Sequence, residues 1–454
     1  MKVRWIAAFL ACLAAGCEES PKPIAPIAQS GELVVLTVNG PSTYFEDAQG
    51  HPSGFEYDLA TMFARELGVT PSFVVTDNPA KIDKLLRDGQ AHLAAAALPR
   101  HFDFPGGLAW GPPYLSTQHQ IVGRAGEAKP KSLQDIAQAR VGVIDESVAE
   151  YLLTVPSQLA HIERLPPGTS TSDLLERVHE GLLDYALVES NRFTLARRFF
   201  PELDVAFNVG KPVDYAWLVS TVDKKRVMDA AKVFFERIRK DGTLKRLVDR
   251  YYSHATRFTS MDSEAMLEKI ATTLPKLKPY FKEAELVSGV DWRLVAALGY
   301  QESHWDPNAT SPTGVRGLMM LTEETADRLQ VKNRLDPRES ILGGARYFAL
   351  LKESLPDRIG EPDRTWITLA AYNIGLGHLE DARILAQSAK LNPDQWQDVR
   401  QMLNRLSEPD TFLTLKHGYA RGFETLQFVD NVRNFYDILA RMEPRGLEVP
   451  EVEK

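Results

Sequence analysis

The sequence predicts a two-lobed α/β domain over residues 32–258, followed by an all-α, lysozyme-like domain over residues 262–448. Three observations lead to this prediction. The chain has 454 residues, enough for roughly two or three domains. In the first range, short apolar runs typical of strands alternate with apolar residues at helical spacing. In the second range the strand pattern stops, and helical patterns dominate.

The elements of the first range follow one another as strand and helix. Strands are expected at 33–38, 92–98, 140–144 and 185–188, and helices at 59–67, 82–86, from 147 on, and around 174–178. Glycines at positions 68, 89 and 181 mark the ends of three of these helices or the turns after them. Alternating units favour a mostly parallel sheet, and two similar units far apart suggest two lobes. The first lobe is expected at 32–123 plus roughly 211–256, with the second lobe between these two segments.

Composition excludes several classes of protein. The formal net charge is −8, with 53 basic and 61 acidic residues, so no basic surplus exists to bind a phosphate backbone and nucleic acid is not an expected partner. Two cysteines are too few for a disulfide scaffold or a zinc site made of cysteines. We expect no metal and no cofactor.

The first residues predict the compartment. Lys2 and Arg4 precede the apolar run Trp5–Ala15, which is too short to span a bilayer of ~30 Å and is typical of a signal peptide over 1–16. Small residues before Cys17 resemble a bacterial lipobox, in which the cysteine is lipidated; a plain secretory signal is the alternative. Glu18, rather than Asp, then favours the periplasmic face of the outer membrane over the inner membrane.

Three prolines between Cys17 and Gly31 indicate an extended tether over residues 17–31. No later stretch reaches ~18 consecutive apolar residues, so no other segment is expected to cross the membrane.

One glutamate of the second domain lies on an apolar helical stripe. Asp291 is a suitable N-cap for a helix that begins at Trp292, and the stripe that contains Val295 reaches Glu302 seven residues later. Desolvation would raise the pKa of such a carboxyl group, which suits a general acid at neutral pH. An exposed glutamate at the end of a helix is the alternative.

Three segments in this order resemble the family 1 lytic transglycosylases, which share the lysozyme-like fold with goose-type lysozyme. They are Glu302-Ser303-His304-Trp305, the stretch from Ser311 to Thr322 with Gly317-Leu318-Met319, and Ala370-Ala371-Tyr372-Asn373-Ile374-Gly375. The resemblance implies that Glu302 is the catalytic residue and that glycan strands of peptidoglycan are the substrate.

The same resemblance assigns substrate-binding residues around Glu302. Ser303 and Ser311 would hydrogen-bond the carboxylate or the substrate, while Tyr372 and Asn373 would position the sugar and its N-acetyl group. The next two residues complete the expected site: Met320, where most of the wider family has Gln, and Phe428. In the fourth motif Phe428 replaces the usual Tyr, so it offers a ring face but no hydroxyl.

The reaction implied is the lytic one. A hydrolase normally uses two carboxylates, and the only near neighbour in sequence is Asp306, which precedes a proline and also suits a turn. In a lytic transglycosylase the 6-hydroxyl of N-acetylmuramic acid (MurNAc) attacks its own C1, which breaks the β-1,4 bond to N-acetylglucosamine (GlcNAc) and leaves a 1,6-anhydroMurNAc end. A hydrolysing muramidase and a receptor without catalytic activity remain alternatives.

The first domain resembles the periplasmic solute-binding proteins of the amino-acid type. The resemblance rests on Gly31-Glu32-Leu33-Val34-Val35, Gly54-Phe55-Glu56-Tyr57-Asp58-Leu59, and Asp241-Gly242-Thr243-Leu244 before Tyr251-Tyr252. It implies that Arg100 clamps a carboxylate and that Glu189 receives an amino group; a surface arginine and a helix-cap acid are the alternatives. The expected ligand is a murein peptide or an amino acid that regulates the helical domain.

Overall fold

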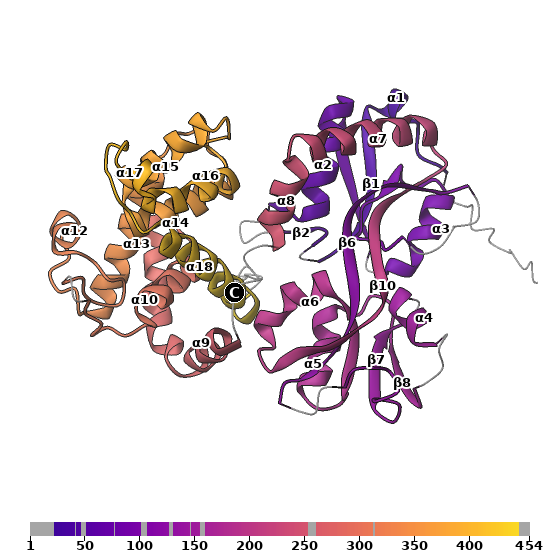
Figure 1. Cartoon of the computed structure of the whole chain (residues 1–454), viewed down its shortest axis with the longest axis horizontal. Helices are drawn as coiled ribbons and strands as arrows, with labels where there is room; N and C mark the ends of the chain where they lie inside the picture. Colours follow the sequence, from indigo (N-terminus) through magenta and orange to yellow (C-terminus); the bar gives the residue numbers. More distant parts are fainter. Residues whose placement is uncertain are drawn as a thin grey trace, which may run out of the picture.

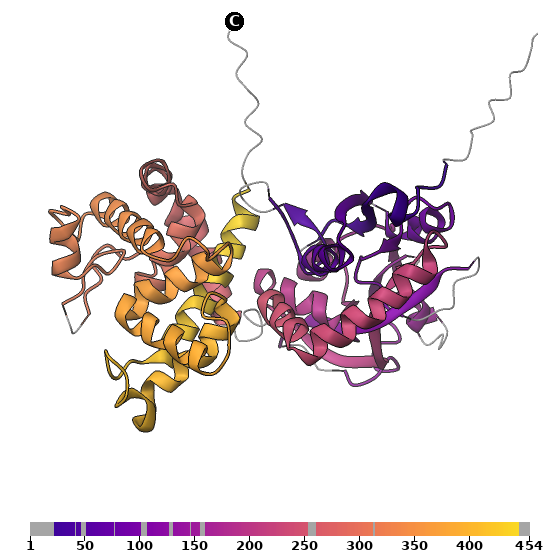
Figure 2. The ribbon, with the colours of Figure 1, turned by 90° about the horizontal axis from the view of Figure 1, so that it is seen from above.

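The computed structural model describes residues 22–40, 42–46, 51–76, 78–100, 107–126, 130–145, 147–154, 159–252, 260–311 and 314–444. An α/β domain and a helical domain follow each other along the chain, and Figure 2 shows them as two bodies side by side. The predicted signal, its lipobox and Cys17 lie outside the described residues. Among the helices that are described, none is both long enough and apolar enough to cross a bilayer.

The α/β domain is built on one mixed sheet with the strand order β4-β1-β5-β10-β6-β9-β7-β8. The strands are β1 (Glu32–Val38), β4 (Thr70–Thr76), β5 (Leu93–Ala94), β6 (Ala109–Arg124), β7 (Arg140–Ile144), β8 (His161–Leu165), β9 (Tyr185–Glu189) and β10 (Leu203–Val219). A small separate hairpin joins β2 (Phe45–Glu46) to β3 (Pro52–Ser53). Each outer part of the large sheet carries its own helices and its own core, which makes two lobes (Figure 1).

The sheet is mixed rather than mostly parallel, since four of the seven strand pairs described in it are parallel and three are antiparallel. The pairs β1–β4, β1–β5, β7–β8 and β7–β9 are parallel, whereas β10 is antiparallel to β5 and β6, and β6 is antiparallel to β9. The two long strands β6 and β10 run through both lobes and tie them together (Figure 1).

Helices cover the sheet in both lobes. They are α1 (Ile27–Ser30), α2 (Phe55–Leu67), α3 (Ile82–Arg87), α4 (Val148–Thr154), α5 (Thr171–His179), α6 (Ser190–Ala196), α7 (Lys224–Lys240) and α8 (Thr243–Tyr252), with the 3₁₀ turns η1 (Pro79–Lys81) and η2 (Arg197–Phe199). The predicted tether 17–31 is wrong for its described part, residues 22–31, because Ile27 of α1 is 1% exposed in the core of the first lobe and the backbone N–H of Ile24 donates to the carbonyl of Gly89. Burial of Ile27 removes an apolar side chain from water, which holds this segment against the lobe.

The helical domain surrounds one central helix, α11. Its elements are α9 (Ser260–Thr272), α10 (Leu274–Ser288), α11 (Trp292–Ser303), α12 (Glu323–Arg328), α13 (Pro337–Glu353), α14 (Asp363–Ile374), α15 (Leu376–Ser388), α16 (Trp396–Leu403), η4 (Asn404–Ser407), α17 (Pro409–Phe412) and α18 (Gly422–Met442). Helix α11 packs against α10, α13 and α18, and every residue from Trp292 to Tyr300 is buried. A helix that is apolar on all sides in this way belongs in a core.

Candidate active site

Helix α11 carries Glu302 from the core to the surface. The predicted N-cap is confirmed, since the side chain of Asp291 accepts a hydrogen bond from the backbone N–H of Arg293. The helix ends at Ser303, and the next residue, His304, has the left-handed φ of 51° that terminates it. Glu302 therefore lies in the last turn and is half-buried, whereas the preceding turns are buried.

The carboxyl group of Glu302 is desolvated and lacks a partner. Within the part of the chain that the structure describes, no hydrogen bond or ion pair reaches its oxygens. Burial raises its pKa to about 8, and no neighbouring charge contributes to that shift. A carboxyl group with this pKa is mostly protonated at neutral pH, which is the state that a general acid needs.

The second motif forms a loop that three helices hold against Glu302. The hydroxyl of Ser303 donates to the carbonyl of Leu318 at 2.8 Å, and the hydroxyl of Tyr372 donates to the carbonyl of Met319 at 3.1 Å. The backbone N–H of Met319 in turn donates to Ser340 Oγ on α13 at 3.1 Å. Since Ser303, Tyr372 and Ser340 belong to α11, α14 and α13, this loop fixes the three helices relative to one another.

A close backbone approach explains the glycine of this loop. Gly317 has a φ of +82°, and a Cβ at this position would lie 1.7 Å from the carbonyl oxygen of Arg334. A side chain is therefore excluded by sterics as well as by backbone conformation. Gly299, one turn before Ser303, similarly leaves room for Leu318 and Met319, whose side chains would lie 2.8 and 2.9 Å from an added Cβ.

The third motif places two polar side chains at the end of α14. Burial raises the pKa of the Tyr372 hydroxyl well above its ordinary value, and the charge of Glu302 adds to this shift. Asn373 is exposed, and its Oδ1 accepts a hydrogen bond of 2.7 Å from the hydroxyl of Thr425 on α18. The amide N–H₂ of Asn373 has no partner among the described residues, so it is available to a ligand.

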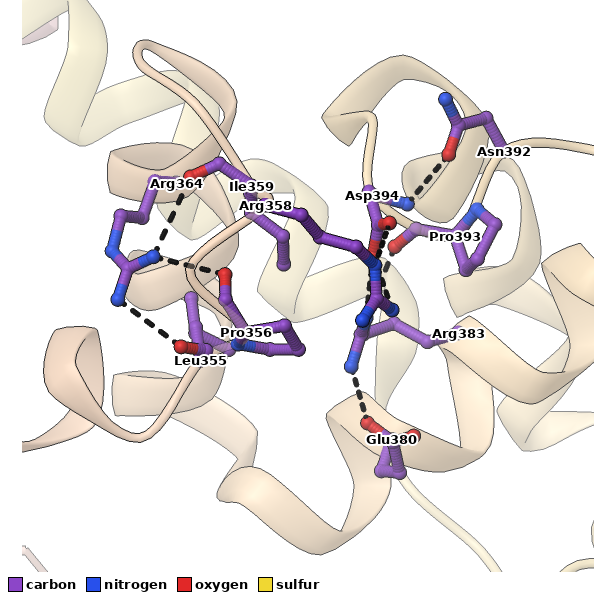
Figure 3. A network of polar contacts seen from close by, with 10 residues as sticks. All are labelled: Leu355, Pro356, Arg358, Ile359, Arg364, Glu380, Arg383, Asn392, Pro393 and Asp394. Atoms are coloured by element: carbon purple, nitrogen blue, oxygen red, sulfur yellow. Dashed lines mark hydrogen bonds and ion pairs between the residues drawn. The ribbon is translucent and has the colours of Figure 1, made fainter.

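Polar contacts fix both ends of the segment that carries this motif (Figure 3). Arg364, in the first turn of α14, donates to the carbonyls of Leu355 and Pro356 in the preceding loop. Beyond α14, the carboxylate of Asp394 binds both Arg358 and Arg383. Because charged groups held by several partners resist displacement, this network joins the loop before α14 to α15 and to the loop after it.

The structure assigns Ser303 and Phe428 different surroundings from those expected. The hydroxyl of Ser303 donates to the backbone carbonyl of Leu318. It therefore holds the loop and does not donate to the carboxylate of Glu302. Phe428 is 6% exposed and packs in the core of the helical domain, so its ring faces other side chains and not an open surface. An apolar ring without a hydroxyl has no polar group to keep at the surface, which explains its burial.

Two further predicted residues lie in the loop around Gly317. Ser311 Oγ accepts a hydrogen bond of 3.2 Å from the backbone N–H of Val315, and the residues at 312 and 313 lie outside the described part. Met320 is half-buried with a φ of 46°, a left-handed conformation that few non-glycine residues adopt. Strain of this kind is common at functional sites.

Some residues of the site carried no recognisable sequence signal. The ring of Tyr347 on α13 lies 5.3 Å from the ring of Tyr372, and Thr425 orients Asn373 from α18. Both come from segments remote in sequence, so only their helical spacing within α13 and α18 could have suggested an inward position. Asp306 is exposed, and its Oδ1 accepts from the backbone N–H of Asn308, as a turn residue does.

The α/β domain places its two predicted ligand residues at the strands that join the lobes. The backbone N–H of Arg100 donates to the carbonyl of Asp214 on β10, and Arg100 itself is exposed. Glu189, at the end of β9, accepts a hydrogen bond of 2.8 Å from Tyr215 and forms a 2.6 Å ion pair with Arg192. Glu189 thus already has a cationic partner.

Comparisons with known proteins match both parts of the chain. The family model for the Transglycosylase SLT domain matches residues 279–394, and the model for bacterial extracellular solute-binding proteins, family 3, matches residues 33–254.

Three curated relatives carry the name "Membrane-bound lytic murein transglycosylase F". The relative from Nitrosospira multiformis is 45% identical and aligns over 97% of this chain and 93% of its own. The relative from Methylobacillus flagellatus is 43% identical over 96% of this chain and 94% of its own. The relative from Marinobacter nauticus is 42% identical over 95% of this chain and 86% of its own.

Proposed function

The chain belongs to the family of membrane-bound lytic murein transglycosylases F, and from this premise we propose that it is a lyase that cleaves the β-1,4 bond between MurNAc and GlcNAc. The single observation that carries the proposal is the Glu302 carboxyl group: burial raises its pKa to about 8, and no carboxylate among the described residues contributes to that shift. A reaction that needs only one carboxyl group fits this site better than hydrolysis, which normally needs two.

One glutamate can serve both steps of such a reaction. Protonated Glu302 donates its proton to the glycosidic oxygen as the bond to C1 breaks, and the GlcNAc end leaves with that proton. The 6-hydroxyl oxygen of the same MurNAc then bonds to C1, and its proton passes to the Glu302 carboxylate. The proton returns to the enzyme, no water is consumed, and the 1,6-anhydro ring closes within one molecule, which removes the entropy cost of a second reactant.

The neighbouring residues support binding of the sugars. The amide N–H₂ of Asn373 can donate to an N-acetyl carbonyl, while Thr425 fixes the orientation of this side chain. Tyr372 positions the loop at Met319, and its hydroxyl is electrostatically coupled to Glu302. Ser303 acts through the same loop, and we assign Ser311 and Met320 to the wall of the site on the basis of their place in it.

Mass spectrometry of the products tests the proposal. Purified murein sacculi are digested with the full chain, and the released muropeptides are weighed. We expect MurNAc ends that are lighter by one water than the corresponding reducing ends. Products with reducing MurNAc ends would instead identify a muramidase, and an absence of cleavage would leave a binding function only.

We propose further that the α/β domain is the regulatory part and that murein peptides or amino acids bind between its lobes. The two lobes are both attached to the helical domain. In the first lobe, Arg250 of α8 pairs with Asp363 of α14 at 2.5 Å and with Asp58 of α2 at 3.2 Å. In the second lobe, Arg198 pairs with Asp437 of α18 at 3.0 Å.

Helix α18 connects these contacts to the active site. Its Arg433 donates to the backbone carbonyl of Arg250 at 2.7 Å, and its Arg441 donates to Ser172 of the second lobe at 2.7 Å. The same helix packs on α11, where the rings of Phe435 and Tyr300 meet at 4.7 Å. A ligand that changes the angle between the lobes therefore has to change at least one of these contacts, which supplies the differential contact that coupling requires.

Kinetics of the full chain test this coupling. A murein peptide or free amino acid that closes the lobes is expected to change the rate of glycan cleavage, and Arg198→Ala is expected to weaken that response. Arg164→Ala is the control, since Arg164 on β8 also forms an ion pair in the second lobe, with Glu150 of α4 at 2.6 Å. Ligand binding by titration calorimetry with no change in rate would contradict regulation.

The ligand residues of the α/β domain stay a proposal with one adjustment. Arg100 is available to bind a carboxylate, whereas Glu189 can receive an amino group only in competition with Arg192. Arg100→Ala is expected to abolish binding of a carboxylate ligand in the same calorimetric experiment; unchanged binding would exclude this cleft as the binding site.

We also propose that Cys17 carries a lipid that holds the protein on the periplasmic face of the outer membrane. The names of the relatives support membrane attachment, and the sequence before Cys17 supports the type of anchor. Labelling with a radioactive fatty acid should mark the wild type but not Cys17→Ala. Equal labelling of the two proteins would exclude this anchor.

A further inference from the structure

The chain turns sharply directly after the third motif. Helices α14 and α15 are separated by Gly375 alone. The backbone N–H of Gly375 donates to the carbonyl of Ala371 in α14 at 2.8 Å, and its carbonyl accepts from the backbone N–H of Leu379 in α15 at 3.1 Å. Because the connection is so short, a shift of the first turn of α15 also moves the end of α14, where Asn373 lies.

A loop from a later part of the chain closes on this turn. The loop 413–421 connects α17 to α18, and the ring of its His417 lies against the backbone of Gly377, in the first turn of α15. A Cβ at Gly377 would lie 2.7 Å from Cδ2 of that ring. A contact this close leaves no space for a side chain at position 377 unless the ring moves.

A buried carboxylate holds the same histidine. Asp381, one turn after Gly377 on α15, is 2% exposed. Its Oδ2 accepts a hydrogen bond of 2.9 Å from the backbone N–H of His417, and Nδ1 of the His417 ring lies 3.3 Å from the same oxygen. A buried carboxylate is costly unless neighbouring groups pair with it, so Asp381 favours the loop position in which His417 reaches it. We call the contacts of His417 with Gly377 and Asp381 the histidine clamp.

The loop 413–421 leads directly to the residue that orients Asn373. Its last residue, Arg421, accepts a hydrogen bond of 3.3 Å at its carbonyl from the backbone N–H of Thr425, in the first turn of α18. The hydroxyl of Thr425 donates to Oδ1 of Asn373 at 2.7 Å. These contacts form a closed circuit. Asn373 and Thr425 are bonded directly, and the histidine clamp joins the segment that follows Asn373 to the segment that precedes Thr425.

We propose that His417 is a positioning residue for Asn373. By holding the start of α15 against the loop before α18, it fixes the direction in which the amide N–H₂ of Asn373 donates to the N-acetyl carbonyl of a bound sugar. This inference rests on the proposed function and adds a residue that acts through its substrate site. A donor that is already fixed loses less conformational freedom on binding. Both a protonated ring and a neutral ring with its proton on Nδ1 can donate to Asp381, so the clamp does not require a charged histidine.

Binding of peptide-free murein glycan strands, measured by titration calorimetry, tests the proposal. All chains are full-length and carry Glu302→Gln, so that the strands are not cleaved. His417→Ala should raise the dissociation constant about fivefold, because a donor that is no longer fixed contributes less to binding. His417→Asn should restore most of this loss, since its side-chain N–H₂ can still donate to Asp381. His179→Ala is the matched control, because His179 forms a similar contact in the α/β domain, with Glu202 at 2.6 Å.

A double-mutant cycle separates positioning from a general effect on the fold. In chains that also carry Asn373→Ala, His417→Ala should change the dissociation constant less than about twofold, because the amide that it positions is absent. An equal loss in both backgrounds, or no loss in either with folding confirmed by circular dichroism, would overturn the proposal. In chains with intact Glu302 the loss should appear in KM, with kcat changed less than about twofold. Failure of the proposed function is a different result, in which the wild type leaves the strands uncleaved; the binding cycle still decides the role of His417.

Discussion

Glu56 and Glu302 both lie in apolar surroundings, but only the carboxylate of Glu56 is hydrogen-bonded by neighbouring groups in the part of the chain that the structure describes. Glu56, in the first turn of α2, is fully buried and accepts hydrogen bonds from Tyr114, from Trp217 Nε1 at 2.9 Å and from the backbone of Ala97 at 2.9 Å. Glu302, in the last turn of α11, is half-buried, and no donor among the described residues reaches it. Burial raises the pKa of both carboxyl groups, but in Glu56 three hydrogen bonds oppose that shift.

This difference in hydrogen bonding indicates a structural role for Glu56 and a chemical role for Glu302. A buried polar group that has all its partners joins elements together, and Glu56 joins α2 to the strands β6 and β10. A desolvated group without partners costs stability and is kept only where a ligand completes it.

The largest effect is expected from Glu302→Gln. The amide has nearly the same shape but cannot donate the proton that the leaving oxygen needs, so cleavage of sacculi should fall by roughly 10²–10⁴-fold. Circular dichroism of the full chain should stay as in the wild type. Near-normal turnover by a folded variant would show that Glu302 is not the acid.

Glu56→Ala should have the opposite effect to Glu302→Gln, because it should lower the stability of the fold and not the rate of the catalytic step. It leaves the buried hydroxyl of Tyr114 and the indole N–H of Trp217 without their acceptor, and we expect a loss of about 3 kcal/mol in the free energy of unfolding. Urea denaturation followed by tryptophan fluorescence measures this loss. Glu236→Ala, on the exposed side of α7, is the control. A loss no larger than that of the control would show that the three hydrogen bonds contribute little.

The elements of the fold that are short and regular could be predicted from the sequence. The strand at 33–38 corresponds to β1, the strands at 140–144 and 185–188 to β7 and β9, and the helix at 59–67 to the greater part of α2. The strand expected at 92–98 is only Leu93–Ala94, because the chain beyond makes isolated contacts instead of a ladder. The pattern of apolar residues within one strand or helix reflects its burial, so these elements could be predicted from local sequence alone.

The long strands β6 and β10 were missed, and with them the mixed sheet. β6 contains Pro112 and Pro113, and its pairing with β10 is interrupted by register shifts. Prolines and bulges break the alternation on which strand prediction depends. The direction of pairing between distant segments also leaves no local signal, so an antiparallel pair within an otherwise parallel α/β sheet could not be inferred.

The site was predicted in its residues more completely than in their roles. The helical stripe and the ordered motifs indicated Glu302, and the structure shows a desolvated carboxyl group there. The catalytic assignment itself stays a prediction. Sequence could not tell that the hydroxyl of Ser303 points to Leu318, or that Phe428 lies in the core, because both depend on how the loop and α18 pack against α11. The spacing of residues shows which face of a helix they share, but it does not show which other elements pack against that face.

The pH dependence of cleavage sharpens the comparison. If Glu302 acts as the acid with a pKa of about 8, kcat/KM on sacculi should be nearly constant up to about pH 7, fall to roughly half near pH 8, and fall about tenfold per pH unit well above it. The fall should be reversible when the sample is returned to neutral pH. An alkaline limit near pH 4.5 would mean that the pKa of the carboxyl group is ordinary and that burial does not keep the acid protonated at neutral pH.

The smallest expected effect is a stability difference between the wild type and Glu302→Gln that grows with pH. The folded chain holds the Glu302 proton up to a pKa of about 8, whereas the unfolded chain releases it near the ordinary value of 4.5. Between these values the folded state binds more protons, so the stability of the wild type falls as pH rises through this window and levels off above it. Glutamine does not titrate. The free energy of unfolding of the variant should therefore match that of the wild type below pH 4.5 and exceed it by on the order of 1–2 kcal/mol at pH 8.5, after discounting for the partial exposure of the side chain.

Calorimetric unfolding of the full chain across this range measures the difference, with Glu353→Gln at the exposed end of α13 as control. A difference that stays constant with pH, or that matches the control, would place Glu302 in ordinary solvent and remove the contrast with Glu56.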